Sequence, residues 1–339
     1  MDDLKPIDGA PDAALPLIDI SMWRSKEPEV RRGIARQVDE ACREIGFLVI
    51  KGHGVPAETI GRLERVARSF FSLPVEEKQA FSSQTPDVYR GYTRIDSAAL
   101  ARAFNDEKAV PDFRETFTAG PEAADKNDPY FFSEAGRDFF AANIWPDRIE
   151  GFRSAWEDYY GEMEKLAAEL MCIFAVALGL EESFFADKID RHISNMLASN
   201  YPRPTARSMA NEVRAGAHTD YGSLTILHAE DKPGGLQVLG TDGAWKNVRI
   251  VPGAFVVNIG DLMARWTNDR WVSTIHRVVN PPADRVDGSD RLSIAFFHQP
   301  NYDAVVECLP SCRGVEGPSH EPVSSGEHLE LKLRQIQAR

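Results

Sequence analysis

The chain has 339 residues, of which 43% are hydrophobic, so it is long enough to bury a large core. Its formal net charge of −13 offers no basic surface, and we expect neither nucleic acid nor a membrane as a partner. The four cysteines are too few for a disulfide framework, and no secretory signal or membrane-spanning stretch is evident. These features predict a protein of the reducing cytoplasm.

The first part of the chain predicts helices mixed with short strands. After a loose N-terminal arm over residues 1–14, we expect a helix and strand region over 15–128. Apolar residues recur within it at helical and strand spacing. The expected helices cover 29–45 and 57–71, and a buried strand covers 47–50. Residues 79–128 lack a clean period, so we expect loops and short strands there that roof a pocket.

The second part of the chain changes from one long helical pattern to many short strands. A support helix is expected over 146–180, and residues 193–310 alternate strand-like runs with Gly, Pro, Asn and Asp turns. This pattern is typical of an antiparallel jelly roll. A last helix over 325–337, capped by Ser325, should pack on the outside. We therefore predict a mainly β fold with flanking helices around a double-stranded β-helix core.

The motif His218-Thr219-Asp220, followed by His276, carries the strongest chemical signal. Two imidazoles and one carboxylate can occupy one face of a metal and leave the other positions open, as in non-haem Fe(II) oxygenases. A structural zinc site is usually closed by four protein ligands instead. Taken singly, each residue also fits a core histidine or a turn-capping aspartate. The ordered set favours the metal site.

A second pair follows in a strand-like run, where Arg291 and Ser293 lie two residues apart and so share one face. A guanidinium beside a hydroxyl is suited to binding a carboxylate. The alternative is a surface arginine with a solvated serine.

The ordered H-x-D, distal H and R-x-S motifs resemble the isopenicillin N synthase-like branch of the Fe(II)/2-oxoglutarate-dependent oxygenases over residues 15–310. The resemblance implies a jelly-roll enzyme that holds Fe(II) at His218, Asp220 and His276. It also implies that Arg291, Ser293 and Tyr201 bind 2-oxoglutarate as co-substrate. The oxidation of a small molecule by O₂ would then release CO₂ and succinate, with hydroxylation, desaturation or cyclisation as the outcome. Ser199 stands where the family has an asparagine, so the contact made by that asparagine is in doubt.

Arg90, Tyr92 and Phe117 fall where relatives place side chains that face the substrate. Arg90 carries a fixed charge, which predicts an acidic substrate group such as a carboxylate. A role in packing or in an ion pair is the alternative for each. Other functions also stay open at this point. They are an oxidase that uses no 2-oxoglutarate, of the isopenicillin N synthase or aminocyclopropane-carboxylate oxidase type, an ethylene-forming variant, and a non-catalytic jelly-roll binding protein.

Overall fold

The computed structural model describes residues 10–25, 27–85, 88–95, 112–125, 127–205, 209 and 213–337. Two β-sheets form its centre. The larger sheet contains β1 (Leu17–Asp19), β2 (Phe47–Lys51), β3 (Gly91–Thr93), β4 (Glu115–Ala119), β5 (Asn195–Tyr201), β7 (Leu224–Ala229), β10 (Phe255–Ile259) and β12 (Arg291–His298). Their spatial order is β1-β2-β10-β7-β12-β5-β4-β3. The smaller sheet contains β6 (Ala215–His218), β8 (Gly235–Leu239), β9 (Trp245–Asn247) and β11 (His276–Val279), in the order β6-β11-β8-β9.

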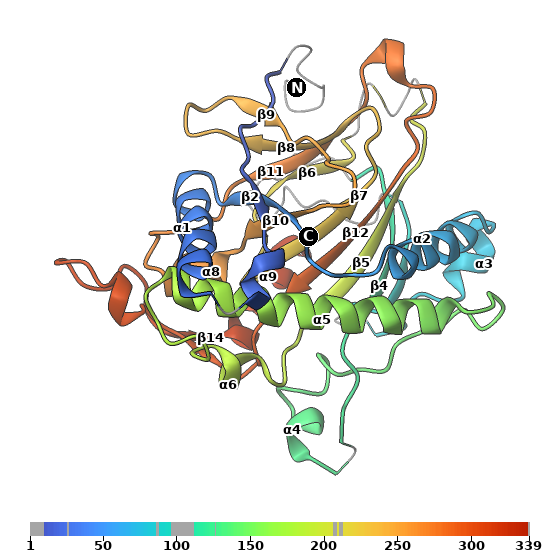
Figure 1. Ribbon diagram of the computed structural model, residues 1–339. Coiled ribbons are helices and arrows are strands. Elements are labelled where there is room, and N and C mark those ends of the chain that lie inside the picture. The colour runs from blue at the N-terminus through green and yellow to red at the C-terminus, as the bar shows by residue number, and fades with distance from the viewer. Residues whose placement is uncertain are drawn as a thin grey trace.

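Apart from the parallel pair β1 and β2, the strands of both sheets pair antiparallel. One pocket is lined by side chains from both sheets, so the sheets face each other across it. This arrangement confirms the predicted jelly-roll core (Figure 1).

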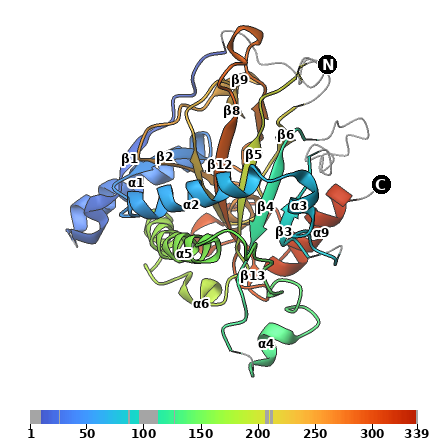
Figure 2. The same cartoon turned by 90° about the vertical axis from the view of Figure 1, so that its right-hand side faces the viewer.

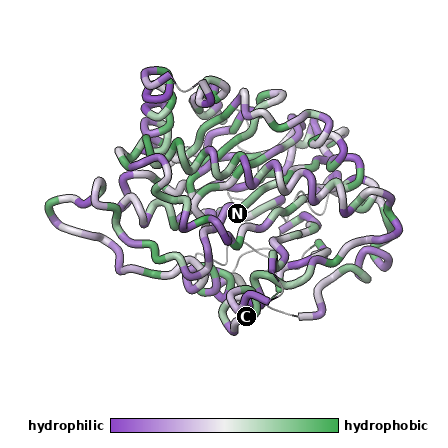
Figure 3. Tube along the Cα trace, turned by 60° about the horizontal axis from the view of Figure 1, so that its bottom comes forward, coloured by the Kyte–Doolittle hydropathy of each residue, from purple (hydrophilic) through white to green (hydrophobic). Residues whose placement is uncertain are grey.

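Three helices cover the larger sheet. These are α1 (Pro28–Glu44), α2 (Ala57–Phe71) and α5 (Phe152–Ala177), and the first two both contact α5 (Figure 2). Each turns an apolar face inward, as the period of 3.6 residues predicts. Hydrophobic residues run along the central strands (Figure 3). The support helix begins at Phe152 rather than at residue 146 because residues 146–151 form a turn.

Shorter elements connect these layers. They are η2 (Ser21–Ser25), α3 (Val75–Gln79), α4 (Pro129–Phe132), α6 (Ala186–Ile189), α8 (Asp261–Trp266), η4 (Ala283–Arg285), β13 (Val305–Val306), η5 (Pro310–Cys312), β14 (Val323–Ser324) and α9 (Ser325–Gln337). In the described part of the chain, no helix is both long and apolar enough to cross a membrane.

The C-terminal helix α9 differs from expectation in two ways. Ser324, rather than Ser325, caps it, because the Ser324 hydroxyl accepts the Glu327 N–H at 3.3 Å while the Glu327 carboxylate accepts from Ser324. The helix is also not merely an outer layer, since Leu329 and Leu333 line a pocket beside the site described below.

Candidate active site

His218, Asp220 and His276 converge between the two sheets. His218 ends β6 and His276 begins β11, and the two residues are paired directly across these strands. The Nε2 atoms of the two histidines lie 3.7 and 3.6 Å from Oδ1 of Asp220, and one ligand atom from each of the three residues lies within 4.8 Å of the others. Asp220 lies beyond the end of β6, in a turn where its carbonyl accepts the Asp261 N–H at 2.8 Å. The turn, rather than strand alternation alone, aims the carboxylate.

Backbone carbonyls fix the orientation of both imidazoles. Nδ1 of His218 lies 2.8 Å from the Gly216 carbonyl, and Nδ1 of His276 lies 3.0 Å from the Thr274 carbonyl. A carbonyl accepts only, so we assign the proton of each neutral ring to Nδ1, which leaves the Nε2 lone pairs directed at Asp220. Burial, with the second imidazole only 4.3 Å away between ring centres, lowers the pKa of His218 to about 3. His218 is therefore neutral near pH 7, as a metal ligand must be.

The second carboxylate oxygen of Asp220 is held by two polar side chains. Oδ2 accepts from Thr225 Oγ1 at 2.6 Å and from Asn258 Nδ2 at 2.7 Å. Burial by itself would raise the pKa of this carboxyl, but the adjacent histidines and these two hydrogen bonds hold it below its ordinary value. The carboxylate is therefore ionised and oriented, with Oδ1 facing the two histidines. Two imidazole nitrogens and one carboxylate oxygen fit a divalent metal that needs open positions.

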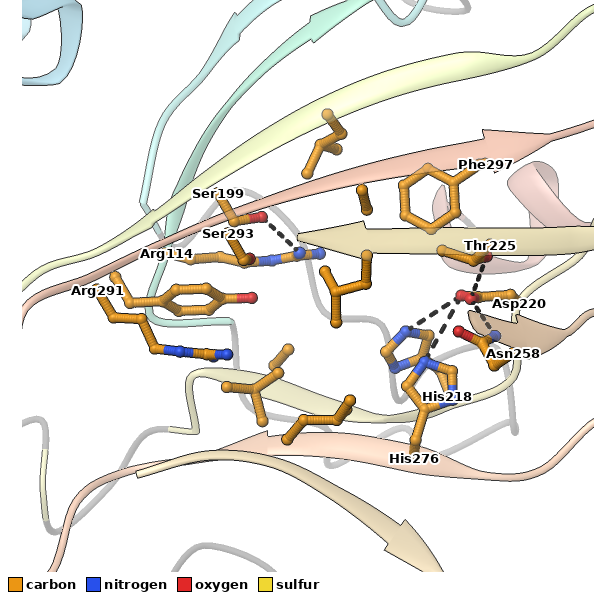
Figure 4. A pocket seen from close by; sticks show the side chains of 17 residues that line it. Arg114, Ser199, His218, Asp220, Thr225, Asn258, His276, Arg291, Ser293 and Phe297 are labelled. Atoms are coloured by element: carbon orange, nitrogen blue, oxygen red, sulfur yellow. Dashed lines mark hydrogen bonds and ion pairs between the residues drawn. The ribbon is translucent and has the colours of Figure 1, made fainter. Parts of the chain in front are cut away.

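Arg291 and Ser293 lie at the other end of the same pocket (Figure 4). Tyr201 also lines this pocket. Arg291 is paired with Tyr201 across β12 and β5, and its guanidinium carbon lies 5.6 Å from the Tyr201 ring centre. The Arg291 side chain is buried, and its Nε donates to the Glu230 carbonyl at 3.2 Å. Within the described part of the chain, no carboxylate forms a salt bridge with Arg291. A buried cation without an acidic partner is costly, so this end of the pocket is suited to an anionic ligand.

Arg114 is a second cation at the site. It lines the pocket containing Arg291 and also a second pocket, and His218 and Asp220 line both pockets. Arg114 Nη1 donates to Ser199 Oγ at 3.2 Å, and Nη2 lies 3.4 Å from Asp112 Oδ2. Burial alone would raise the pKa of Tyr201, but Arg114 and Arg291 hold it below its ordinary value. Ser199, where the family has asparagine, thus contacts Arg114.

Arg90, Tyr92 and Phe117, which were expected to face the substrate, line neither of these two pockets. Phe117 packs among aromatic rings, 5.0 Å from the centre of Phe70, and the Tyr92 hydroxyl donates to the Glu115 carboxylate at 2.7 Å. Arg90 is buried and donates to backbone carbonyls and to the Asn195 side chain. The polar groups of Arg90 and Tyr92 are thus used inside the protein, and a substrate contact for the three residues stays a prediction that these two pockets do not support.

Sequence reasoning missed Arg114, Thr225 and Asn258. Asn258 interrupts an otherwise apolar strand, Phe255–Ile259, and a polar residue in such a run signals a buried partner. Arg114 shares a two-residue period with Thr116 and Thr118, but only the fold shows that this face of β4 borders a pocket.

Comparisons with known proteins agree with this geometry. Residues 15–148 match the family described as the non-haem dioxygenase in morphine synthesis N-terminal region, and residues 193–300 match the 2OG-Fe(II) oxygenase superfamily. The 2-oxoglutarate-Fe(II) type oxidoreductase hxnY of Emericella nidulans is 35% identical over 92% of this chain and 87% of its own length. The homoarginine-6-hydroxylase 2-ODD-233 of Oryza sativa subsp. japonica is 32% identical over 96% of this chain and 98% of its own length. The chain therefore belongs to the 2OG-Fe(II) oxygenase superfamily.

Solved structures support the same fold. A full-length Neurospora crassa protein, solved in complex with alpha-KG and 5-formyluracil, superposes with a TM-score of 0.79, at 28% identity over 96% of each chain. The protein described here is a 2-oxoglutarate-dependent Fe(II) dioxygenase that acts on a small molecule, and the relatives favour this function over the oxidase, ethylene-forming and non-catalytic alternatives. Its cofactor is Fe(II), and its co-substrates are 2-oxoglutarate and O₂.

Proposed function

We propose that His218, Asp220 and His276 hold the Fe(II) and that Arg291, Ser293 and Tyr201 receive the distal carboxylate of 2-oxoglutarate. The observation that carries this assignment is the placement of three convergent ligand atoms in one pocket with a buried arginine that forms no salt bridge to a described acidic residue. Bound iron supplies the redox chemistry, in which 2-oxoglutarate and O₂ become succinate and CO₂ while the substrate is oxidised.

The protein residues have positioning roles in this assignment. The Gly216 and Thr274 carbonyls fix the imidazole tautomers, while Thr225 and Asn258 orient the carboxylate. Apolar side chains between the iron ligands and Arg291 keep the co-substrate pocket dry, which strengthens the contact between guanidinium and carboxylate. They are Leu197, Leu227, Leu236, Val278 and Ala295.

An anaerobic titration tests the assignment. Adding 2-oxoglutarate to the Fe(II) protein should produce the weak visible charge-transfer band of an iron chelate. In Arg291→Gln the band should require a higher 2-oxoglutarate concentration while the iron content is unchanged. Iron loss in Arg291→Gln, or a band at the wild-type concentration, would contradict the assignment.

We place the substrate in the second pocket, which shares His218 and Asp220 with the co-substrate pocket. The acidic substrate group expected from the sequence would meet Arg114 rather than Arg90, because Arg114 is the arginine that lines this pocket. Arg114→Gln should then raise the KM for a carboxylated substrate far more than the KM for 2-oxoglutarate. Equal increases would assign Arg114 to the co-substrate instead.

The cellular compartment stays a prediction from the sequence. Its support is that Cys42, Cys172, Cys308 and Cys312 are all free thiols, as a reducing cytoplasm would keep them.

A further inference from the structure

Leu197 of β5 and Phe297 of β12 line both pockets, and we call the two pockets together the trough. Its far end is the part of the second pocket that is lined by Asn195 and Gln299. On β12, Arg291 and Ser293 line the co-substrate pocket, and Phe297 lines both pockets. Gln299, just past the strand, lines only the second pocket. Asn195 lies opposite Phe297 on β5 and lines this second pocket too. At about 3.4 Å per residue, Gln299 lies about 27 Å along the chain from Arg291.

Gln299 has a hydrogen-bonded backbone N–H and an amide oxygen that has no partner among the described residues. Its backbone N–H donates to Ser194 Oγ at 3.1 Å, and the residue is 3% exposed. Oε1 is buried without a hydrogen-bond partner among the described residues. The amide has room only because residue 222 is glycine, where a Cβ would lie 3.0 Å from Gln299 Nε2 and 2.2 Å from the His298 carbonyl. An unpaired buried acceptor is costly, so the amide end is suited to a ligand.

Asn195 presents a hydrogen-bond donor, which complements the acceptor of Gln299. Its Oδ1 accepts from Arg90 Nη1 at 2.9 Å, so its NH₂ is the end left for the pocket, and this NH₂ has no acceptor among the described residues. Arg90 is held in turn by the Phe139 carbonyl at 2.6 Å and the Tyr89 carbonyl at 2.9 Å. A Cβ at Gly120 would lie 2.3 Å from the Arg90 guanidinium carbon and 2.4 Å from Asn195 Oδ1. Arg90 is thus a positioning residue that fixes which way the Asn195 amide faces.

The far end of the trough has no charged side chain among its described lining residues, although the buried Arg90 guanidinium lies behind Asn195. Among the described lining residues of the second pocket, the arginine and the aspartate, Arg114 and Asp220, also line the co-substrate pocket. A guanidinium held by Asn195 and Gln299 would therefore lack a counter-charge. A carboxylate would have only Arg90 nearby, whose N–H groups already donate to backbone carbonyls and to Asn195. Apolar side chains also line the second pocket. They are Leu197, Phe297, Leu329 and Leu333.

We propose that Asn195 and Gln299 form an amide-binding end of the substrate pocket. The substrate presents a planar group with adjacent C=O and N–H, as in a carboxamide, a lactam or a ureido group. Its carbonyl accepts from Asn195 Nδ2, and its N–H donates to the oxygen of the Gln299 amide. The inference rests on the proposed function, because it takes the second pocket as the substrate pocket.

Three probes of nearly equal shape test the inference: benzamide, acetophenone and benzoate. Binding of each to the anaerobic Fe(II)–2-oxoglutarate enzyme is measured by calorimetry. Benzamide should bind about tenfold tighter than acetophenone, which lacks the N–H, since one hydrogen bond accounts for about that factor. Benzoate reports on Arg114 and should respond to Arg114→Gln but not to changes at Gln299.

Two variants test whether Gln299 and Asn195 cause the tighter binding of benzamide. Gln299→Met keeps the side-chain volume, removes the amide and should abolish the preference for benzamide over acetophenone. It should not lower the free energy of unfolding, because it replaces an unpaired buried polar group. Asn195→Asp keeps the acceptor for Arg90, removes the donor and should weaken benzamide binding about tenfold. Gln37→Met, on the exposed side of α1, is the control.

Succinate formed from 2-oxoglutarate without substrate separates the possible failures. A wild-type enzyme that forms succinate but binds benzamide and acetophenone equally, or binds neither, overturns the inference alone. So does a Gln299→Met variant that retains the benzamide preference, or one that loses it together with stability. A wild-type enzyme that forms no succinate overturns the proposed function, and this inference with it.

Discussion

Asn258→Leu should weaken iron binding although it replaces none of the residues assigned as iron ligands. The Asn258 side chain is buried and donates to Asp220 Oδ2 at 2.7 Å, and Thr225 donates to the same oxygen at 2.6 Å. A hydrogen bond to a charged group stabilises by about 1.5–3 kcal/mol. Loss of one partner of a metal ligand lowers metal affinity about 10- to 100-fold. We expect this loss for Asn258→Leu, with a similar loss for Thr225→Val and a larger one for the double variant.

The assay is anaerobic competition for Fe(II) with a chromophoric chelator. Asn247→Leu is the matched control, because the Asn247 amide donates to the Ala10 carbonyl and accepts from Gln237, away from Asp220. The control should bind iron like the wild type. A dissociation constant for Asn258→Leu within about twofold of wild type, with the fold intact by circular dichroism, would refute the argument that this hydrogen bond orients the carboxylate.

Four further outcomes follow from the same geometry. Asp220→Ala should lose most of its iron and all turnover, because two imidazoles hold Fe(II) poorly; full iron content by metal analysis would contradict the ligand assignment. Arg291→Gln should cost about 2–5 kcal/mol in 2-oxoglutarate binding, and equal succinate production at limiting 2-oxoglutarate would oppose this. Arg90→Ala should lower the free energy of unfolding by about 3 kcal/mol or more in urea titrations, because it leaves buried carbonyls unpaired; a stable variant with altered substrate use would restore Arg90 as a substrate contact. Burial, reinforced by His192, lowers the pKa of His298 from 6.5 to about 3, so the unfolded chain binds a proton that the native state excludes. Stability should therefore fall as the pH drops from about 6.5 toward 3, by up to about 1.4 kcal/mol per pH unit, and His298→Gln should show a shallower slope in denaturant titrations at about pH 6 and pH 4.

The sequence by itself determined the elements whose signal is local. Helices α1 and α2 carry apolar residues along the face that packs inward. In the structure, both helices begin and end within one residue of the predicted positions. The order of His218, Asp220, His276 and Arg291 also identified the family, because these residue types in that order form the motifs that the chain shares with it. Neither inference depends on which distant segment of the chain packs against these residues.

Only the tertiary structure decided what each polar side chain contacts. The same poorly periodic region contains both Arg90 and Arg114. Arg90 donates hydrogen bonds to Asn195 and to nearby backbone carbonyls, whereas Arg114 lines both pockets. The sequence predicts that Leu329 belongs to a helix on the outside of the fold, but in the structure it lines a pocket. The physical reason is that burial and hydrogen-bond pairing depend on residues far away in the chain, such as Gln299 packed against Gly222, and no local pattern records them.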